Sequence, residues 1–438
     1  MALKAEAQRM AAEFEFSRES LNNAVRKFAE EMTEGLEKQG THMSQIPTYV
    51  TAVPNGTETS KVAVPRALME TQVPSDLFGY LAKQIEHFLE TYHADRLLAH
   101  RRSVGSVPHF DLGFTFSFPV DQTQIDALRL PVRVTALVND TVGTLMARSY
   151  TSPGNESTLL GAIFGTGTNG AYVEQLDKVK KMKMIDEREG GSRYDRSTGL
   201  MIVNTEWGSF DNALNVLPDT PYDQSLDNES NNKGIQMFEK RVSGMFLGEI
   251  LRRAILALYN HPDPEISFLK DVNSGDNDMR TATSIDEDSA LFKQWGIDTS
   301  FLSIVEEDQS DHLRITKQML EKELGISGAS TENAIVVKML VHAIGRRAAR
   351  LAAVAMGAVV LETRSLEKDG FADIGVDGSL VEYYPGFEDY VREAFREMDG
   401  IGAEGEKKIR IGLAKDGSGL GAALIALVAH ESERRGSI

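Results

Sequence analysis

The sequence predicts an α/β fold, in which strands and helices alternate along one chain. Apolar runs of strand length lie between longer segments whose apolar residues return at helical spacing. No pattern repeats with a period of 20–50 residues, so a solenoid is not expected. With 438 residues, of which 41% are hydrophobic, the chain can form one large two-lobed unit or two to three ordinary domains.

The first half of the chain begins with a predicted helical arm, because residues 1–40 place apolar side chains at helical spacing. Residues 41–75 are rich in proline and poor in helix formers, so we expect extended chain or loop there. An amphipathic helix is predicted next, over residues 77–92. The strands predicted in this half cover residues 110–120, 131–138 and 159–165, and the last of them ends in a glycine-rich turn.

The second half continues the alternation of strands and helices. Residues 263–311 are polar and poor in pattern, which predicts a mobile loop region. The other elements expected here are a strand over 199–204, one long helix over 239–259, a helix over 332–361, a strand into a turn over 374–378, and a glycine-rich turn that opens a C-terminal helix over 417–428.

Composition narrows the class of protein. The net charge of −18 argues against nucleic acid or an anionic membrane as the main partner. The absence of cysteine excludes a disulfide framework and a thiolate metal site. The N-terminus lacks the apolar segment of a signal peptide, and the longest apolar run, 351–361, is too short to span a bilayer. We therefore expect an intracellular soluble protein.

A glycine-rich turn follows the predicted strand at 159–165. It reads Gly165, Thr166, Gly167, Thr168, Asn169 and Gly170. Glycines let backbone N–H groups approach a phosphate, and threonine hydroxyls add further donors. The same residues also suit a plain tight turn. The segment is not a Walker A loop, because no Lys-Ser/Thr pair follows.

Three carboxylates and a second glycine cluster stand at the ends of predicted elements. Asp140 follows a strand and suits either a general base acting on an alcohol or a helix N-cap. Glu206 and Glu239 suit either bidentate binding of sugar hydroxyls or a role at a helix dipole or surface. The glycines at 417, 419 and 421 suit either a nucleotide close to the backbone or tight helix packing.

The order of these motifs resembles that in the hexokinase family, and the sequences of the motifs are most similar to those of fungal hexokinases and glucokinases. The matching segments are FTFSFPV (114–120), LVNDTVGTL (137–145), IFGTGTNGAYVE (163–174), NTEWGSFDN (204–212), FEKRVSGMFLGEILR (238–252), IGVDGSLVEYYPGF (374–387) and GSGLGAALIA (417–426). The similarity extends from about Ile46 to Val428 and covers most of the chain.

The resemblance implies a two-lobed actin-like ATPase fold of the ribonuclease H-like class, here with a truncated small lobe. It implies transfer of the γ-phosphate of ATP, with Mg²⁺, to the 6-hydroxyl of a hexose such as glucose. The residues that match the family are Asp140 as the base, Ser117, Asn139, Asn169, Glu206 and Glu239 at the sugar, Gly165, Thr166, Gly167 and Thr168 at the phosphates, and Gly417, Ser418, Gly419 and Gly421 at the adenosine.

The same resemblance divides the chain into three parts. An N-terminal helical arm covers residues 1–43, a small-lobe region covers 44–150, and a large-lobe region covers 151–438. We expect a cytoplasmic protein, with the nucleus as an alternative location, and the resemblance allows a regulatory protein partner. No membrane or nucleic-acid contact is expected, and no residue is assigned to a metal.

Two segments of the family pattern are missing. The strand at FSFPV is followed in the family by Trp-Thr-Lys-Gly-Phe, whereas residues 124–130 here carry no Thr-Lys pair. A hairpin containing Asp-Leu-Gly-Gly-Thr-Asn, the family's first phosphate loop, is replaced by residues 61–69, which have no Gly-Gly pair and no Asp. Phosphoryl transfer depends on positioning and on neutralisation of charge, so both losses bear directly on rate.

Three interpretations of these departures stay open at this point. The first is a catalytically impaired family member that retains partial hexose binding and acts in a sugar-responsive or regulatory role. The second is an active ATP-dependent hexose kinase with an unusual phosphate site. The third is that the sequence lacks exons that the natural product contains.

Overall fold

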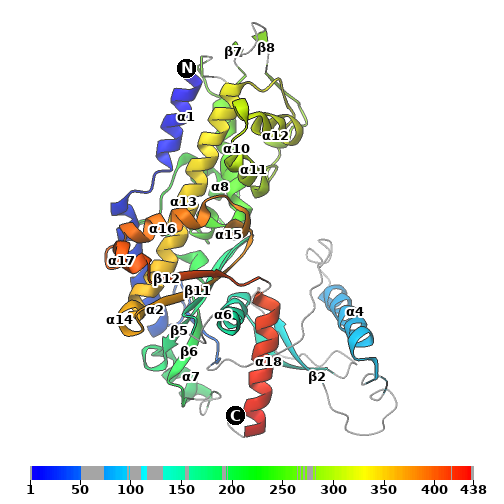
Figure 1. The fold of residues 1–438 in the computed structure, drawn as a ribbon, viewed down its shortest axis with the longest axis vertical. Coiled ribbons are helices and arrows are strands. Elements are labelled where there is room, and N and C mark those ends of the chain that lie inside the picture. Colours follow the sequence, from blue (N-terminus) through cyan, green and yellow to red (C-terminus); the bar gives the residue numbers. More distant parts are fainter. Residues whose placement is uncertain are drawn as a thin grey trace.

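The computed structural model describes residues 2–50, 74–95, 98, 110–115, 132–152, 157–189, 194, 196–263, 265, 266, 268, 269, 272, 273, 280, 281, 283–415 and 417–435 (Figure 1). The predicted strands at 110–120 and 131–138 are confirmed as β2 (Phe110–Thr115) and β3 (Val132–Val138), which pair in parallel. Both segments that depart from the family pattern, 61–69 and 124–130, lie outside the described residues, and so does Ser117.

A six-stranded mixed sheet forms the centre of the part of the molecule that contains the main hydrophobic core. Its order is β1 (Ile46–Pro47), β6 (Leu200–Asn204), β5 (Thr168–Gln175), β4 (Leu160–Phe164), β11 (Ala372–Asp377) and β12 (Ile409–Leu413). Neighbours from β1 to β4 run antiparallel, and β4, β11 and β12 run parallel. The alternation of strands and helices predicted an α/β fold, and the fold is confirmed.

The longest helix, α13 (Thr331–Thr363), runs through the main hydrophobic core. Ser330 caps its N-terminus in a capping box with Asn333, and its residues from Ala348 to Val360 are buried. Helices α1 (Ala2–Glu13) and α2 (Arg18–Glu37) pack against it, and Figure 1 shows α1 alongside the upper part of α13 in this view. The apolar run at 351–361 therefore belongs to a packed core.

Helix α6 (Asp140–Thr151) crosses the sheet and packs against α18 (Gly417–Arg435). Helix α6 approaches both the sheet and α18 closely, because glycines at the two contacts face the neighbouring backbone. A Cβ on Gly161 of β4 would lie 2.4 Å from the Leu145 N of α6, and a Cβ on Gly421 would lie 2.1 Å from the Gly143 O. The far end of α6 is fixed by Arg148, which donates to both carboxylate oxygens of Asp373 on β11 at 2.6 and 2.9 Å.

Two expectations from the sequence are wrong in detail. The helix expected over 239–259 is divided at Ser243 into α9 (Glu239–Val242) and α10 (Gly244–Tyr259), because the N–H groups of Gly244 and Met245 donate to the carbonyls of Gly165 and Thr166. The region at 263–311, expected to be a loop, contains helix α11 (Thr299–Glu307), capped by Asp298.

The other described helices and strands lie outside the six-stranded sheet. They are α4 (Pro74–Tyr92), η1 (Leu176–Lys178), α7 (Lys181–Glu189), η2 (Trp207–Ser209), α8 (Pro221–Glu229), β7 (Val272–Asn273), β8 (Arg280–Thr281), β9 (Ser284–Ile285), η3 (Ala290–Phe292), η4 (Asp311–Leu313), α12 (Arg314–Leu324), β10 (Ile326–Ser327), α14 (Ser365–Lys368), α15 (Ser379–Tyr383), α16 (Phe387–Glu397) and α17 (Gly402–Glu406). In the described part of the chain, no helix combines the length and the apolar character that a membrane crossing requires. The domain boundaries at 43 and 150 stay a prediction.

Candidate active site

Polar side chains meet where strands β5 and β6 come together in the sheet. Asn169 on β5 donates through Nδ2 to the Oδ1 of Asn204 at 2.8 Å and to the Oε1 of Glu206 at 3.1 Å. Asn204 donates to the same Glu206 oxygen at 2.7 Å. Glu206 has left-handed backbone angles, φ 53° and ψ 43°, which a glutamate rarely adopts. The hydrogen bonds therefore fix a carboxylate on a strained turn.

Glu239 connects this region to the glycine-rich turn. Its Oε2 accepts a hydrogen bond from the Thr168 N–H at 2.9 Å, and a Cβ on Gly167 would lie 2.8 Å from that oxygen. Burial is the main cause that raises the pKa of the Glu239 carboxyl above its usual value, and the nearby charge of Glu206 acts in the same direction. A side chain at 167 would therefore require the Glu239 carboxylate to shift.

The turn itself presents backbone donors. The Gly165 N–H donates to the Gly167 oxygen at 3.0 Å, and the Thr168 N–H is taken by Glu239. Among the described residues, none accepts a hydrogen bond from the N–H of Thr166 or of Gly167. Two neighbouring N–H groups of this kind can bind an anion, as the phosphate interpretation requires, or water, as in a plain tight turn. The phosphate role of this turn stays a prediction.

Trp207 lies beneath the turn. Its side chain is fully buried, and its Nε1 donates to the Oγ1 of Thr168 at 3.0 Å. The indole stacks on Phe164 with ring centroids 5.9 Å apart, and a Cβ on Gly170 would lie 2.3 Å from the indole ring. Trp207 is thus a core residue that nevertheless contacts the turn through one polar atom.

Asp140 stands at the first position of helix α6. The sequence left open whether Asp140 is itself the cap, and that alternative is wrong by one residue: Asn139 is the N-cap and accepts the Thr141 N–H at 2.9 Å. One carboxylate oxygen of Asp140 also accepts the Thr141 N–H at 2.9 Å. The helix start therefore fixes the Asp140 carboxylate by backbone geometry.

The glycines at the start of α18 divide between the two roles that the sequence left open. Gly417 and Gly421 face α6, since a Cβ on either would lie within 2.9 Å of its backbone. The Ser418 carbonyl accepts a hydrogen bond from the Thr115 Oγ1 at 2.8 Å. Among the described residues, a Cβ on Gly419 would meet no atom within 4 Å. Tight packing therefore explains Gly417 and Gly421, whereas no described residue packs against Gly419.

Two polar residues of this region were missed by the sequence analysis. Asn204 precedes Glu206 by two positions, a spacing that puts both on one face of an extended chain, and this signal could have found it. Gln236 carries a buried side-chain oxygen without a partner among the described residues, next to Gly208. The described residues contain no group of His, Cys, Asp and Glu side chains that could hold a metal ion.

Comparison with known families gives a match over most of the chain. A family model described as hexokinase matches residues 159–428, and a second one, also described as hexokinase, matches residues 6–64 and 58–130. The chain belongs to the hexokinase family. Family membership, predicted from the motif order, is confirmed.

Named relatives cover nearly the whole chain. It is 48% identical to a glucokinase of Aspergillus niger, with 99% of each chain covered, and 35% identical to glucokinase-1 of Saccharomyces cerevisiae, with 95% of each covered. A solved hexokinase of Schistosoma mansoni, complexed with glucose, has a TM-score of 0.75 at 26% identity and covers 97% of this chain and 99% of its own. A second solved hexokinase has a TM-score of 0.72.

Proposed function

We propose that this hexokinase-family protein is an active ATP-dependent hexose kinase that phosphorylates glucose at its 6-hydroxyl. The observation that carries the proposal is the hydrogen bond from the Thr168 N–H to Glu239, because it joins the carboxylates suited to a sugar to the turn suited to a phosphate. The 48% identity to a glucokinase over 99% of both chains supports it. We therefore prefer an active enzyme to the catalytically impaired protein that the two missing family segments favoured.

Each side chain has a role that its chemistry allows. Glu206 and Glu239 accept hydrogen bonds from sugar hydroxyls, and Asn169 orients Glu206 while facing the same sugar. Asp140 accepts the proton of the 6-hydroxyl as that oxygen bonds to phosphorus and the bond to the departing diphosphate breaks. Holding the hydroxyl in line with the phosphate supplies most of the rate, because phosphoryl transfer depends on positioning.

The residues present fit a nucleotide in part. The N–H groups of Thr166 and Gly167 can donate to phosphate oxygens, and Gly419 leaves room beside the start of α18. Mg²⁺ supplies charge neutralisation when it is bound with the nucleotide. It is usually held by phosphates, water and one or two carboxylates.

A coupled assay with glucose, ATP and Mg²⁺ tests the proposal. We expect turnover in the ordinary enzyme range of about 1–1000 per second. Asp140→Ala should lower it by on the order of 100- to 10,000-fold while the circular dichroism spectrum stays unchanged. Activity that persists in this variant would place the base elsewhere.

The impaired, sugar-responsive protein remains the second candidate, because residues 61–69 and 124–130 lack the Gly-Gly pair and the Thr-Lys pair of the family. It predicts negligible turnover together with a saturable change in tryptophan emission on adding glucose, since Trp207 contacts the turn through Thr168. A regulatory protein partner belongs to this candidate alone. A cytoplasmic location is common to both candidates and is part of the proposal.

The control for sugar binding is Glu206→Gln, which keeps the shape of the side chain and removes its charge. A response to glucose that is identical in this variant would exclude Glu206 from the sugar site. A flat titration in the parent protein, with no turnover, would leave neither candidate standing.

A further inference from the structure

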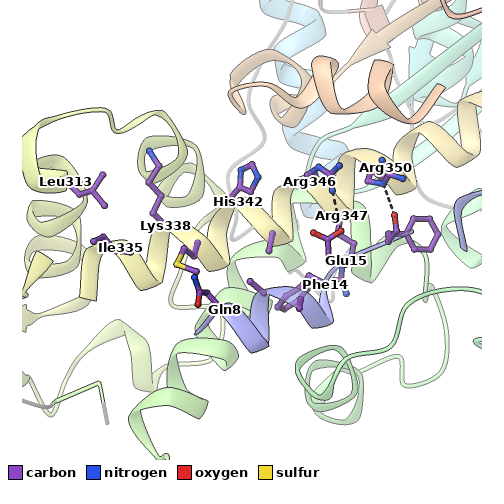
Figure 2. Close-up of a pocket in the computed structure, with 15 residues that line it drawn as sticks. Gln8, Phe14, Glu15, Leu313, Ile335, Lys338, His342, Arg346, Arg347 and Arg350 are labelled. Atoms are coloured by element: carbon purple, nitrogen blue, oxygen red, sulfur yellow. Dashed lines mark hydrogen bonds and ion pairs between the residues drawn. The ribbon is translucent and has the colours of Figure 1, made fainter. Parts of the chain in front are cut away.

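A groove of about 790 Å³ lies between helix α1 and one face of helix α13, and its lining includes none of the candidate active-site residues (Figure 2). Its volume falls in the range of ligand pockets, about 300–1,000 Å³. Helix α13 contributes two rows at a spacing of four residues, one apolar and one cationic or titratable. The apolar row is Ile335, Met339 and Ala343, and the other row is Lys338, His342 and Arg346.

The two ends of the groove differ in chemistry. Figure 2 shows Leu313 and Ile335 at one end and Arg346, Arg347 and Arg350 at the other. Ile335 and Arg347 are about 18 Å apart along the helix, at about 1.5 Å per residue. Helix α1 and the residue after it add Ala11, Ala12 and Phe14 to the opposite wall. The groove is thus elongated, with an apolar body and a cationic end.

Two guanidinium groups at the cationic end are buried and incompletely paired. Arg347 is 1% exposed and donates to Asp223 through Nη1 and Nη2, at 2.6 and 2.8 Å. Arg350 is 2% exposed and donates to the Phe16 carbonyl through Nε and to Glu397 through Nη2. The Nε of Arg347 and the Nη1 of Arg350 have no partner among the described residues.

Such unpaired buried donors are rare in native proteins and indicate a missing acceptor. A third donor group stands at the rim. Arg346 forms ion pairs with Glu15 at 3.5 Å and with Glu393 at 3.6 Å, and these long contacts leave N–H donors on its guanidinium for a ligand. Planar guanidinium groups match the two oxygens of a carboxylate particularly well.

We propose that the groove between α1 and α13 binds an amphipathic carboxylate, with its head at Arg346 and Arg350 and its apolar chain over Ala343, Met339 and Ile335. The apolar row excludes water along the chain of the ligand, and the carboxylate supplies the acceptor that the Nη1 of Arg350 lacks. Because the ligand bridges α1 and α13, its binding stabilises the docking of the N-terminal helix.

Calorimetry with the full-length protein tests the ligand class, with decanoate as the probe at concentrations below its self-association. We expect saturable binding at one site. Decanol, which has the chain without the charge, and acetate, which has the charge without the chain, should each bind about tenfold more weakly or worse. Equal affinity for decanol would overturn the carboxylate head, and equal affinity for acetate would overturn the apolar body.

Two variants locate the site. Ala343→Leu fills the apolar floor, and Arg346→Gln removes a charge from a partly exposed side chain, so both should fold. Each should weaken decanoate binding about tenfold or more. Arg396→Gln on helix α16 is the matched control, since it removes the same charge outside the groove and should leave the affinity unchanged. Equal affinities in the Arg346→Gln and Arg396→Gln variants would place the ligand elsewhere.

Discussion

Glu206 and Asp140, proposed to act on the same sugar, are held in place by different means. Glu206 is fixed by side chains, because Asn169 and Asn204 both donate to one of its oxygens. Asp140 is fixed by the backbone, because it begins helix α6. Helix α18 packs against α6, and Arg148 of α6 donates to Asp373. The first arrangement is sensitive to the loss of one polar group. The second is sensitive to a change of side-chain volume far from the reacting atoms.

A large loss of activity is expected at Glu239, which lies near Glu206. Glu239→Gln keeps an acceptor for the Thr168 N–H but removes the charge that binds sugar hydroxyls. Charge-assisted hydrogen bonds contribute about 1.5–3 kcal/mol each, so losing two lowers kcat/KM by on the order of 100-fold or more. Steady-state kinetics measure this, and a change below about threefold would remove Glu239 from the sugar site.

The next effect is on stability, in the packing of helix α6, which begins at Asp140. Gly421→Val places a side chain against the Gly143 backbone and should reduce the free energy of unfolding by about 1–3 kcal/mol, as overpacking does. Because α6 must move, kcat should fall as well. Gly419→Ala is the control, since its Cβ meets none of the described residues within 4 Å, and urea titration should show it no less stable than the parent. Equal losses in both variants would contradict the packing role of Gly421.

A smaller effect is expected from Asn204, the residue that motif reading missed. Asn204→Ala removes one of the two side-chain donors to Glu206 and should raise KM for glucose by about tenfold, since a hydrogen bond to a charged group contributes about 1.5–3 kcal/mol. The kcat should change less, because Asp140 is fixed by a different element. An unchanged KM would show that Asn169 alone orients Glu206.

The smallest effect is a pH dependence of stability at Glu239. Its pKa is raised mainly by burial, so the folded state binds this proton more tightly than the unfolded state does. The stability from this group is fully present below the unfolded pKa, about 4.5, and is lost as pH rises through the folded pKa. Glu239→Gln should therefore be more stable than the parent at pH 7, and the difference should close as pH falls toward 4.5. Thermal unfolding across this range checks it, and a gap that widens toward acid would reverse the sign.

Much of the site could be predicted from sequence, because its signals are local. The turn from Gly165 to Thr168 follows a strand, and Asp140 begins a helix, as the motifs indicated. The contact between Glu239 and Thr168 could not be predicted by spacing, since they are 71 positions apart in the chain. Helix α11 was missed although Asp298 gives a capping signal before an apolar helical pattern, because the surrounding polar residues dominated the prediction.

The sequence by itself determined the alternation of strands and helices, the order of the motifs and therefore the family, because periodicity and turn chemistry act over a few residues. The tertiary structure decided which role each ambiguous residue has. Gly421 packs against α6, whereas no described residue packs against Gly419, and a glycine's role depends on which backbone approaches it. The break at Ser243 has the same origin, because the carbonyls of Gly165 and Thr166 accept the first N–H groups of α10, and only folding brings those groups together.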